Sequence, residues 1–227
     1  MKFKVILFDL DGTLVRIPKN FLKLINNLVL QACMEIGIQI SINKIGELWS
    51  SGNKYSEVLI KWGINKQDIS KFWNIFDHKD FKLRKELIKK GEMRLYEDTI
   101  PILRLIKSKY NIKTGVISNT PHEKAWYEIT QFHLEQFLDC KVFLGSINQK
   151  YAKPEPDGIL WCLNDLNEFI KQEKKILFVG DSEIDIIAGK KAKISTAYIV
   201  RDHNLSHLKT QPDYYLKSLY ELADLLN

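Results

Sequence analysis

The spacing of apolar residues changes along the chain, and each change predicts a different kind of element. Residues 4–8 form a short β-branched and aromatic run that predicts a buried strand. Over residues 21–36 the apolar positions follow the i, i+3, i+4 rhythm of a helix, and Gly37 is a suitable stop. Shorter helices are expected over 42–49, 55–62, 67–76 and 80–90.

Beyond residue 97 the pattern alternates between helices and strands. Strands are expected over 112–117, 141–144, 176–179, 198–200 and 213–216. Helices are expected over 98–109 and 156–166, from His122 and just after Ser182. Such alternation is typical of a parallel sheet with helices on both faces. The predicted fold is a Rossmann-like α/β core, residues 1–14 and 97–227, with a helical domain inserted after the first strand, residues 15–96.

Composition indicates a globular, soluble chain. Of the 227 residues, 45% are hydrophobic and 27% are charged, a balance that excludes disorder. The N-terminal apolar run is too short for a signal peptide, and no stretch reaches the roughly 18 apolar residues of a membrane span. Three widely spaced cysteines have no metal-ligand spacing and build no disulfide framework, which favours the cytoplasm and predicts that all three are buried: Cys33, Cys140 and Cys162.

The net charge of +6 is concentrated in the predicted insert. Residues 15–96 carry 15 Lys and Arg against 8 Asp and Glu. One interpretation is a solvated helical surface, and the other is a positive field that attracts an anionic substrate. Exposed faces are expected for four lysines, Lys82, Lys85, Lys89 and Lys90. No nucleic-acid-binding motif accompanies the charge, and a nucleic-acid partner is therefore not expected.

Residues that can carry chemistry follow the predicted strands, where open α/β sheets bind ligands. Carboxylates that converge there would repel one another unless a cation such as Mg²⁺ offset their charge. A lysine and a hydroxyl could then balance the charge of a phosphoryl group. The residues are Asp9 and Asp11 after the first strand, Ser118 and Asn119 after the second, Lys153 before the helix at 156–166, and Asp181 and Asp185 after the strand at 176–179.

In order and spacing these residues resemble the four motifs of the haloacid dehalogenase superfamily, in its capped, phosphoglycolate phosphatase-like branch. Asp9-Leu10-Asp11-Gly12-Thr13 is similar to the first motif and Ser118 to the second. Lys153 is similar to the third, and Asp181 with Asp185 to the fourth. The resemblance covers the whole chain, including a helical cap between the first and second motifs.

The resemblance implies a covalent reaction. Asp9 would attack phosphorus and form an aspartyl-phosphate. Asp11 would protonate the leaving oxygen and then take a proton from the hydrolytic water.

The resemblance also implies ligands for metal and phosphate. Asp9, the backbone carbonyl of Asp11 and Asp181 would hold Mg²⁺. Ser118 and Lys153 would bind phosphate, and Asn119 would contribute its amide or its backbone N–H. Asp185 would support the metal or orient Lys153.

Two residues of the insert are candidate substrate contacts. Arg16 stands where relatives often carry an acid, and it could reach an anionic group of the substrate or pair with a carboxylate of the insert. Lys54 lies in a segment similar to a substrate-closing loop, although a solvated lysine is an equal interpretation. Three tryptophans are expected to form the core of the insert: Trp49, Trp62 and Trp73.

The resulting expectation is a Mg²⁺-dependent phosphatase that acts on a small phosphorylated metabolite, with phosphoglycolate as the best single candidate, in a monomer or a homodimer. A phosphonatase with Lys54 as its Schiff-base lysine and a sugar phosphomutase are the enzyme alternatives within the same superfamily. A non-catalytic binding protein on this fold is the alternative from another class.

Overall fold

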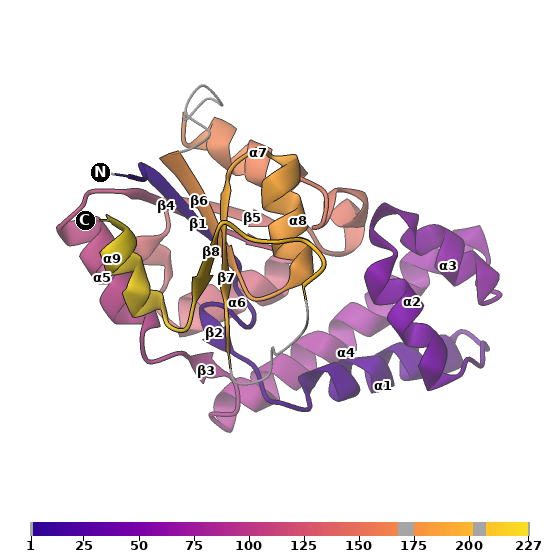
Figure 1. The fold of residues 1–227 in the computed structure, drawn as a ribbon. Helices are drawn as coiled ribbons and strands as arrows, with labels where there is room; N and C mark the ends of the chain where they lie inside the picture. The colour runs from indigo at the N-terminus through magenta and orange to yellow at the C-terminus, as the bar shows by residue number, and fades with distance from the viewer. Residues whose placement is uncertain (1, 168–174, 202–207, 227) are drawn as a thin grey trace.

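The computed structural model describes residues 2–167, 175–201 and 208–226, and its centre is a six-stranded parallel sheet (Figure 1). The strand order β5-β4-β1-β6-β7-β8 places the first strand in the middle. The predicted parallel α/β core is confirmed. The strands are β1 (Val5–Phe8), β4 (Lys113–Ser118), β5 (Cys140–Phe143), β6 (Ile176–Gly180), β7 (Ser195–Ile199) and β8 (Tyr214–Leu216).

Both faces of the sheet are covered by helices, and β1 shows why. All four residues of β1 are buried, and successive side chains point to opposite faces. Val5 and Leu7 belong to the cluster with α7 (Asp157–Asp165) and α8 (Glu183–Lys191). Ile6 and Phe8 belong to the cluster with α5, α6 and α9. These helices span Thr99–Ser108, His122–Gln131 and Leu222–Leu226.

The helical insert leaves the core through two very short strands. β2 (Val15–Arg16) pairs antiparallel with β3 (Arg94–Leu95), and the two ends of the insert therefore lie side by side (Figure 1). The long helices α1 and α4 pack together, and α2 and α3 lie at their far end. The four helices span Phe21–Glu35 (α1), Ile45–Ser50 (α2), Tyr55–Lys61 (α3) and Ile69–Lys89 (α4).

Helix α4 corrects the expected break between 76 and 80. The predicted helices at 67–76 and 80–90 are one continuous helix, Ile69–Lys89. No Gly or Pro interrupts it, and its buried face continues through Asp80 and Arg84, which pair at i, i+4. The apolar pattern stops at Asp80 because the buried positions of the helix from there on include an ion pair of charged residues. The sequence pattern therefore looks like a break in the helix. By contrast, α1 ends as expected, with Gly37 in the left-handed region at φ 79°.

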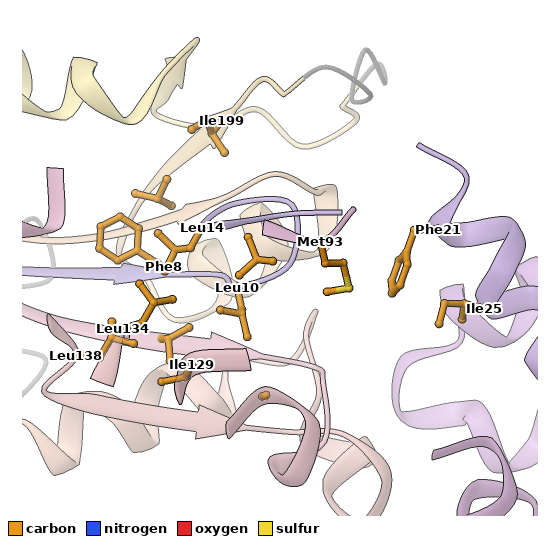
Figure 2. Packing of buried hydrophobic residues seen from close by; sticks show 14 of the residues in the cluster. Phe8, Leu10, Leu14, Phe21, Ile25, Met93, Ile129, Leu134, Leu138 and Ile199 are labelled. Carbon is orange, nitrogen blue, oxygen red and sulfur yellow. The ribbon is translucent and has the colours of Figure 1, made fainter. Parts of the chain in front are cut away.

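One hydrophobic cluster joins the sheet to the insert. Figure 2 shows Phe8 and Leu10 on the sheet side, Met93 at the junction, and Phe21 and Ile25 on the α1 side. Because a single cluster spans both parts, the position of the insert is set by apolar packing as well as by the two connecting segments.

Side-chain exposure agrees with the expectations for single residues. All three cysteines, Cys33, Cys140 and Cys162, are buried. All four lysines expected on open helix faces, Lys82, Lys85, Lys89 and Lys90, are exposed. Among the described residues, none of the helices has the length and apolar character that a membrane crossing requires.

Candidate active site

The loop after β1 turns at Gly12, and this turn packs against Asp181 in the loop after β6. Gly12 has φ 85°, and its N–H donates to the carbonyl of Val15 over 2.7 Å. A Cβ at position 12 would lie 2.3 Å from Oδ2 of Asp181. The Thr13 hydroxyl donates to Oδ1 of Asp181 over 3.4 Å. Glycine is required at this position because both its conformation and the space beside Asp181 exclude a side chain.

Lys153 bridges two carboxylates, one just after β1 and one in the first turn of α8. Its Nζ donates to Oδ1 of Asp9 over 2.5 Å and to Oδ1 of Asp185 over 2.7 Å. All three side chains are buried. Burial raises the pKa of Asp9, Lys153 opposes that rise, and the negative charges of Asp185 and Asp181 add to it. The pKa of Lys153 is raised because its two carboxylate partners outweigh the effect of burial.

Asp185 has a second, local role at the start of α8. The backbone N–H of Ser182 donates to Oδ2 of Asp185 over 3.0 Å, and the Ser182 hydroxyl also bonds to that oxygen. The pair forms a capping box, which satisfies N–H groups at the helix start. Asp185 is therefore fixed by its own helix while its other oxygen holds Lys153.

Three carboxylates gather where the sequence predicts a cation. Asp9, Asp181 and Asp185 each offer an oxygen, and these oxygens lie within 4.8 Å of one another. One lysine, Lys153, carries a single positive charge beside three carboxylates. Oxygen donors with excess negative charge suit a hard divalent ion such as Mg²⁺, and these residues therefore fit the expected metal.

The loop after β4 supports Lys153 through Asn119. The Asn119 side chain donates from Nδ2 to the Lys153 carbonyl over 2.9 Å and accepts from the Lys153 N–H over 2.8 Å. Ser118 is the last residue of β4, and its Oγ accepts from the Thr120 N–H over 3.0 Å. The Asn119 amide is thus engaged with the backbone that presents Lys153.

Asp11 lies apart from the other three carboxylates and faces the insert. Its Oδ2 accepts from Nη1 of Arg84 and from the Thr120 hydroxyl, each over 2.9 Å. Its Oδ1 is buried and has no hydrogen-bond partner among the described residues. An unpaired carboxylate oxygen at this place can give or take a proton.

Arg84 belongs to a buried ionic network that sequence reasoning missed. It also bonds to Asp80, over 3.0 Å, and to Glu128 of α6, over 2.5 Å. Lys124 of α6 binds Asp80 over 2.5 Å, which completes the link between α4 and α6. Burial and the charge of Asp11 raise the pKa of Glu128 to about 8, against the effect of Arg84.

The only sequence signal for this network is its spacing. Asp80 with Arg84 and Lys124 with Glu128 are opposite charges at i, i+4, a pattern that solvated helix faces share. Nothing in that pattern indicates burial, and exposed pairs are its natural interpretation.

A cavity of about 250 Å³ lies between the insert and the core. Lys153 and Asn119 line its core side, and Arg84 and Trp73 line its insert side. The cavity therefore gives a bound molecule access to both Lys153 and the insert.

The two candidate substrate contacts lie elsewhere. Arg16 lines a separate cavity of about 250 Å³ together with Arg94 and Arg201. Lys54 is exposed, and neither residue is among the described residues that line the cavity next to Lys153. Of the three tryptophans expected in the core of the insert, Trp62 and Trp73 are buried in it and Trp49 packs against it half-buried. Trp49 and Trp73 also line the cavity next to Lys153, and Trp62 is not among its described lining residues.

Comparisons with solved structures agree with this fold. A "predicted phosphoglycolate phosphatase" from Haemophilus somnus superposes with a TM-score of 0.72 at 21% identity, over 100% of this chain and 99% of that one. CbbY from Rhodobacter sphaeroides, solved in complex with phosphate, has the same TM-score at 17% identity, over 97% and 96% of the two chains.

Sequence relatives cover the chain as well. Pyrophosphatase PpaX of Listeria welshimeri is 24% identical over 232 residues, 99% of this chain and 97% of its own length. Pyrophosphatase PpaX of Halalkalibacterium halodurans is 31% identical over 117 residues, about half of each protein. The profile of the family described as haloacid dehalogenase-like hydrolase matches residues 6–199, from β1 through β7. This chain, with its acid-lined strand ends and its helical insert, belongs to the haloacid dehalogenase-like hydrolases.

Proposed function

We propose that this protein is a Mg²⁺-dependent phosphatase that hydrolyses a small phosphomonoester through an aspartyl-phosphate. The observation that carries the proposal is the contact of Lys153 with Asp9, 2.5 Å, beside the further carboxylates of Asp181 and Asp185. A buried carboxylate that is held by a lysine of the cavity lining suits attack on an anionic phosphoryl group.

The reaction has two displacements at phosphorus. A carboxylate oxygen of Asp9 forms a bond to phosphorus as the bond to the ester oxygen breaks, and Asp11 gives its proton to that leaving oxygen. Water then attacks phosphorus, Asp11 takes a proton from the water, and the bond between Asp9 and phosphorus breaks. The unpaired Oδ1 of Asp11 supports this role, because one oxygen is available while Arg84 and Thr120 hold the other.

The phosphoryl oxygens would be bound by Ser118 and Lys153. Asn119 acts on the same group by holding the backbone of Lys153, and its own backbone N–H is a further donor in the proposal. Lys153 also restrains Asp9 through their direct contact, which places the nucleophile and the phosphate-binding cation together.

Mg²⁺ would be held by Asp9, Asp181 and the backbone carbonyl of Asp11, with Asp185 as the supporting carboxylate. When bound, it supplies positive charge to the phosphoryl oxygens and to the crowded carboxylates. Asp185 keeps Lys153 in place through a 2.7 Å bond while its other oxygen is committed to Ser182.

Residues 15–96 would act as a cap over a core made of residues 1–14 and 97–227. The paired strands β2 and β3 form a narrow connection, and the cavity lies between the two parts. Closure of such a cap excludes water other than the nucleophile and completes the site.

Phosphoglycolate and pyrophosphate are the reference substrates for this proposal. The first gives its name to a structural neighbour, and the second gives its name to the sequence relatives. Lys54, the lysine of the phosphonatase alternative, is exposed and lies outside the described lining of the cavity, which favours the phosphatase.

The test is release of inorganic phosphate from a panel of small phosphomonoesters and pyrophosphate, with Mg²⁺ and then with EDTA. We expect release that needs Mg²⁺ and falls on the order of 10⁴-fold or more in Asp9→Asn. Glu57→Gln, at an exposed position in the insert, is the matched control and should keep full activity. Full activity in Asp9→Asn would overturn the mechanism, and phosphate transfer between sugar positions without free phosphate would indicate the mutase.

A further inference from the structure

The wall that the insert contributes to the cavity is aromatic. Phe21, Trp49, Trp73 and Phe76 all line it. The Trp49 and Phe76 rings are 5.9 Å apart, and Trp73 meets Phe76 edge-on at 5.6 Å. These rings therefore form one continuous surface that faces the same space as Lys153.

Helix α1 adds two residues to the lining of this cavity, and Figure 2 shows both of them. Phe21 and Ile25 project from α1 toward Met93 and the sheet, and both residues also line the cavity. Because the wall is an extension of the main hydrophobic cluster, its shape is fixed by packing.

Two cations that line the cavity, Arg84 of α4 and Lys124 of α6, are already paired with carboxylates. Nζ of Lys124 binds Asp77 over 2.9 Å and also contacts Asp80. Arg84 binds Asp11 and Asp80, and Glu128 takes part in the same pairing. Among the described residues that line the cavity, Lys153 is the only other lysine or arginine, and it faces the reacting phosphate in the proposed mechanism.

The same wall is unfavourable for a second anionic group on the substrate. Asp77 and Asp80 line the cavity, and a carboxylate or a second phosphate beside them would be repelled. Such a group would also have to compete with Asp77 and Asp80 for Lys124, since both carboxylates already bind its Nζ.

On the basis of the phosphatase function proposed above, we propose that the leaving group of the substrate is a short, uncharged alcohol that carries one aromatic ring. A ring gains from burial against Trp49, Trp73 and Phe76 and from edge-on contacts with them. A cavity of about 250 Å³ is small beside the roughly 300–1,000 Å³ of drug-sized sites, and a single ring is the size that it accommodates. The substrate class is thus an arylalkyl phosphomonoester, in place of an ester with a second acidic group.

The test compares kcat/KM for 2-phenylethyl phosphate, ethyl phosphate and phosphoglycolate at saturating Mg²⁺. The first two release primary alcohols of similar reactivity, and their difference therefore reports the ring alone. We expect 2-phenylethyl phosphate to exceed both others by at least about tenfold. An equal or lower value, with either other ester turned over, overturns this inference and leaves the phosphatase intact. Turnover of none of the three, with phosphate released from another member of the panel, overturns this inference alone. Release from no member of the panel overturns the phosphatase function as well.

Two variants test whether the aromatic wall causes the preference for 2-phenylethyl phosphate over ethyl phosphate. In Trp49→Leu the ratio of kcat/KM for 2-phenylethyl phosphate over ethyl phosphate should fall at least about fivefold. Trp62→Leu, a buried tryptophan of the same insert that is not among the described lining residues, should keep the wild-type ratio. An equal loss of the ratio in both variants would overturn the assignment.

A binding measurement avoids dependence on either variant. In the wild-type enzyme, 2-phenylethylphosphonate should inhibit competitively at a concentration at least about tenfold lower than ethylphosphonate. Equal inhibition by the two phosphonates would contradict an aromatic wall.

Discussion

Nη1 of Arg84 lies 2.9 Å from Oδ2 of Asp11, and a buried cation of helix α4 thereby holds a carboxylate of the first loop. The contact joins the insert to the core at the residue proposed to move protons. Arg84 also forms ion pairs with Asp80 and Glu128. Its pKa is raised because these partners outweigh burial, which by itself lowers it.

Removal of this cation should destabilise the fold. Arg84→Met leaves three buried or half-buried carboxylates without their shared partner, and we expect a loss of about 3–5 kcal/mol in the free energy of unfolding. Urea denaturation at pH 7 measures it. Lys82→Met, on an exposed face of the same helix, should change the value by less than about 0.5 kcal/mol. Similar values for the two variants would show that the network does not need Arg84.

Asp98 should make stability depend on pH. It accepts from Nη1 and Nη2 of Arg201 over 2.9 and 3.0 Å, and from the Leu219 N–H over 2.8 Å. Although burial raises the pKa of Asp98, these bonds outweigh it and the pKa is lowered. A carboxyl with a depressed folded pKa stabilises the protein above its unfolded pKa, about 3.9, and that contribution is lost as the pH falls through the folded value.

The measurement is urea denaturation of the wild type and Asp98→Asn at several pH values. At pH 7 the variant should be less stable by on the order of 2 kcal/mol, and the difference should shrink below about pH 4. A difference that stays constant from pH 7 to pH 3 would mean that the charge of Asp98 is not the source of the stability.

A comparison of Gly12 with Gly37 distinguishes the effect of backbone strain from the effect of crowding next to Asp181. Gly12 and Gly37 have similar positive φ values, 85° and 79°, and alanine at either position costs about 1–2 kcal/mol of strain. Only at position 12 would the new Cβ strike another residue, Asp181, at 2.3 Å, whereas nothing lies within 4 Å at position 37. Gly12→Ala should therefore lose at least about 10²-fold in phosphate release, and Gly37→Ala should stay near the wild type. Equal activity in the two variants would argue against a role for the Asp181 position.

The strand-end acids could be predicted because parallel topology determines where they meet. Once the chain is interpreted as alternating strands and helices, Asp9, Asp181 and Lys153 must converge at one edge of the sheet. The structure does bring their side chains together. Local signals were sufficient here, since each residue directly follows a strand or lies on a loop at that edge.

The insert side could not be predicted in the same way. Whether Arg84 meets Asp11, or Trp73 lines a cavity as well as packing in the core, depends on how α4 docks against α6. That docking is set by contacts between residues far apart in the chain, such as Phe81 with Tyr127, whose rings are 5.5 Å apart. The sequence pattern of α4 is the same for a solvated face and for a buried ionic one, and the choice belongs to tertiary packing.

Mg²⁺ should stabilise the folded protein through the carboxylates of Asp9, Asp181 and Asp185. A ligand that binds only the folded state adds about 2.7 kcal/mol when its concentration is about 100 times its dissociation constant. The thermal midpoint should therefore rise with added Mg²⁺. The rise should be much smaller in Asp181→Asn and unchanged in Glu57→Gln, which is exposed in the insert.

The rise of the thermal midpoint with Mg²⁺ should become smaller as the pH is lowered. The pKa of Asp9 is raised by burial and by the two neighbouring carboxylates, and acid therefore neutralises this ligand earlier than an ordinary aspartate. A protonated carboxyl binds a divalent ion poorly, and proton uptake thus competes with Mg²⁺. Thermal scans with and without Mg²⁺ from pH 8 to pH 5, at constant ionic strength, measure the effect. A Mg²⁺-dependent rise that is constant over this range, or that persists in Asp181→Asn, would place the cation outside these three carboxylates.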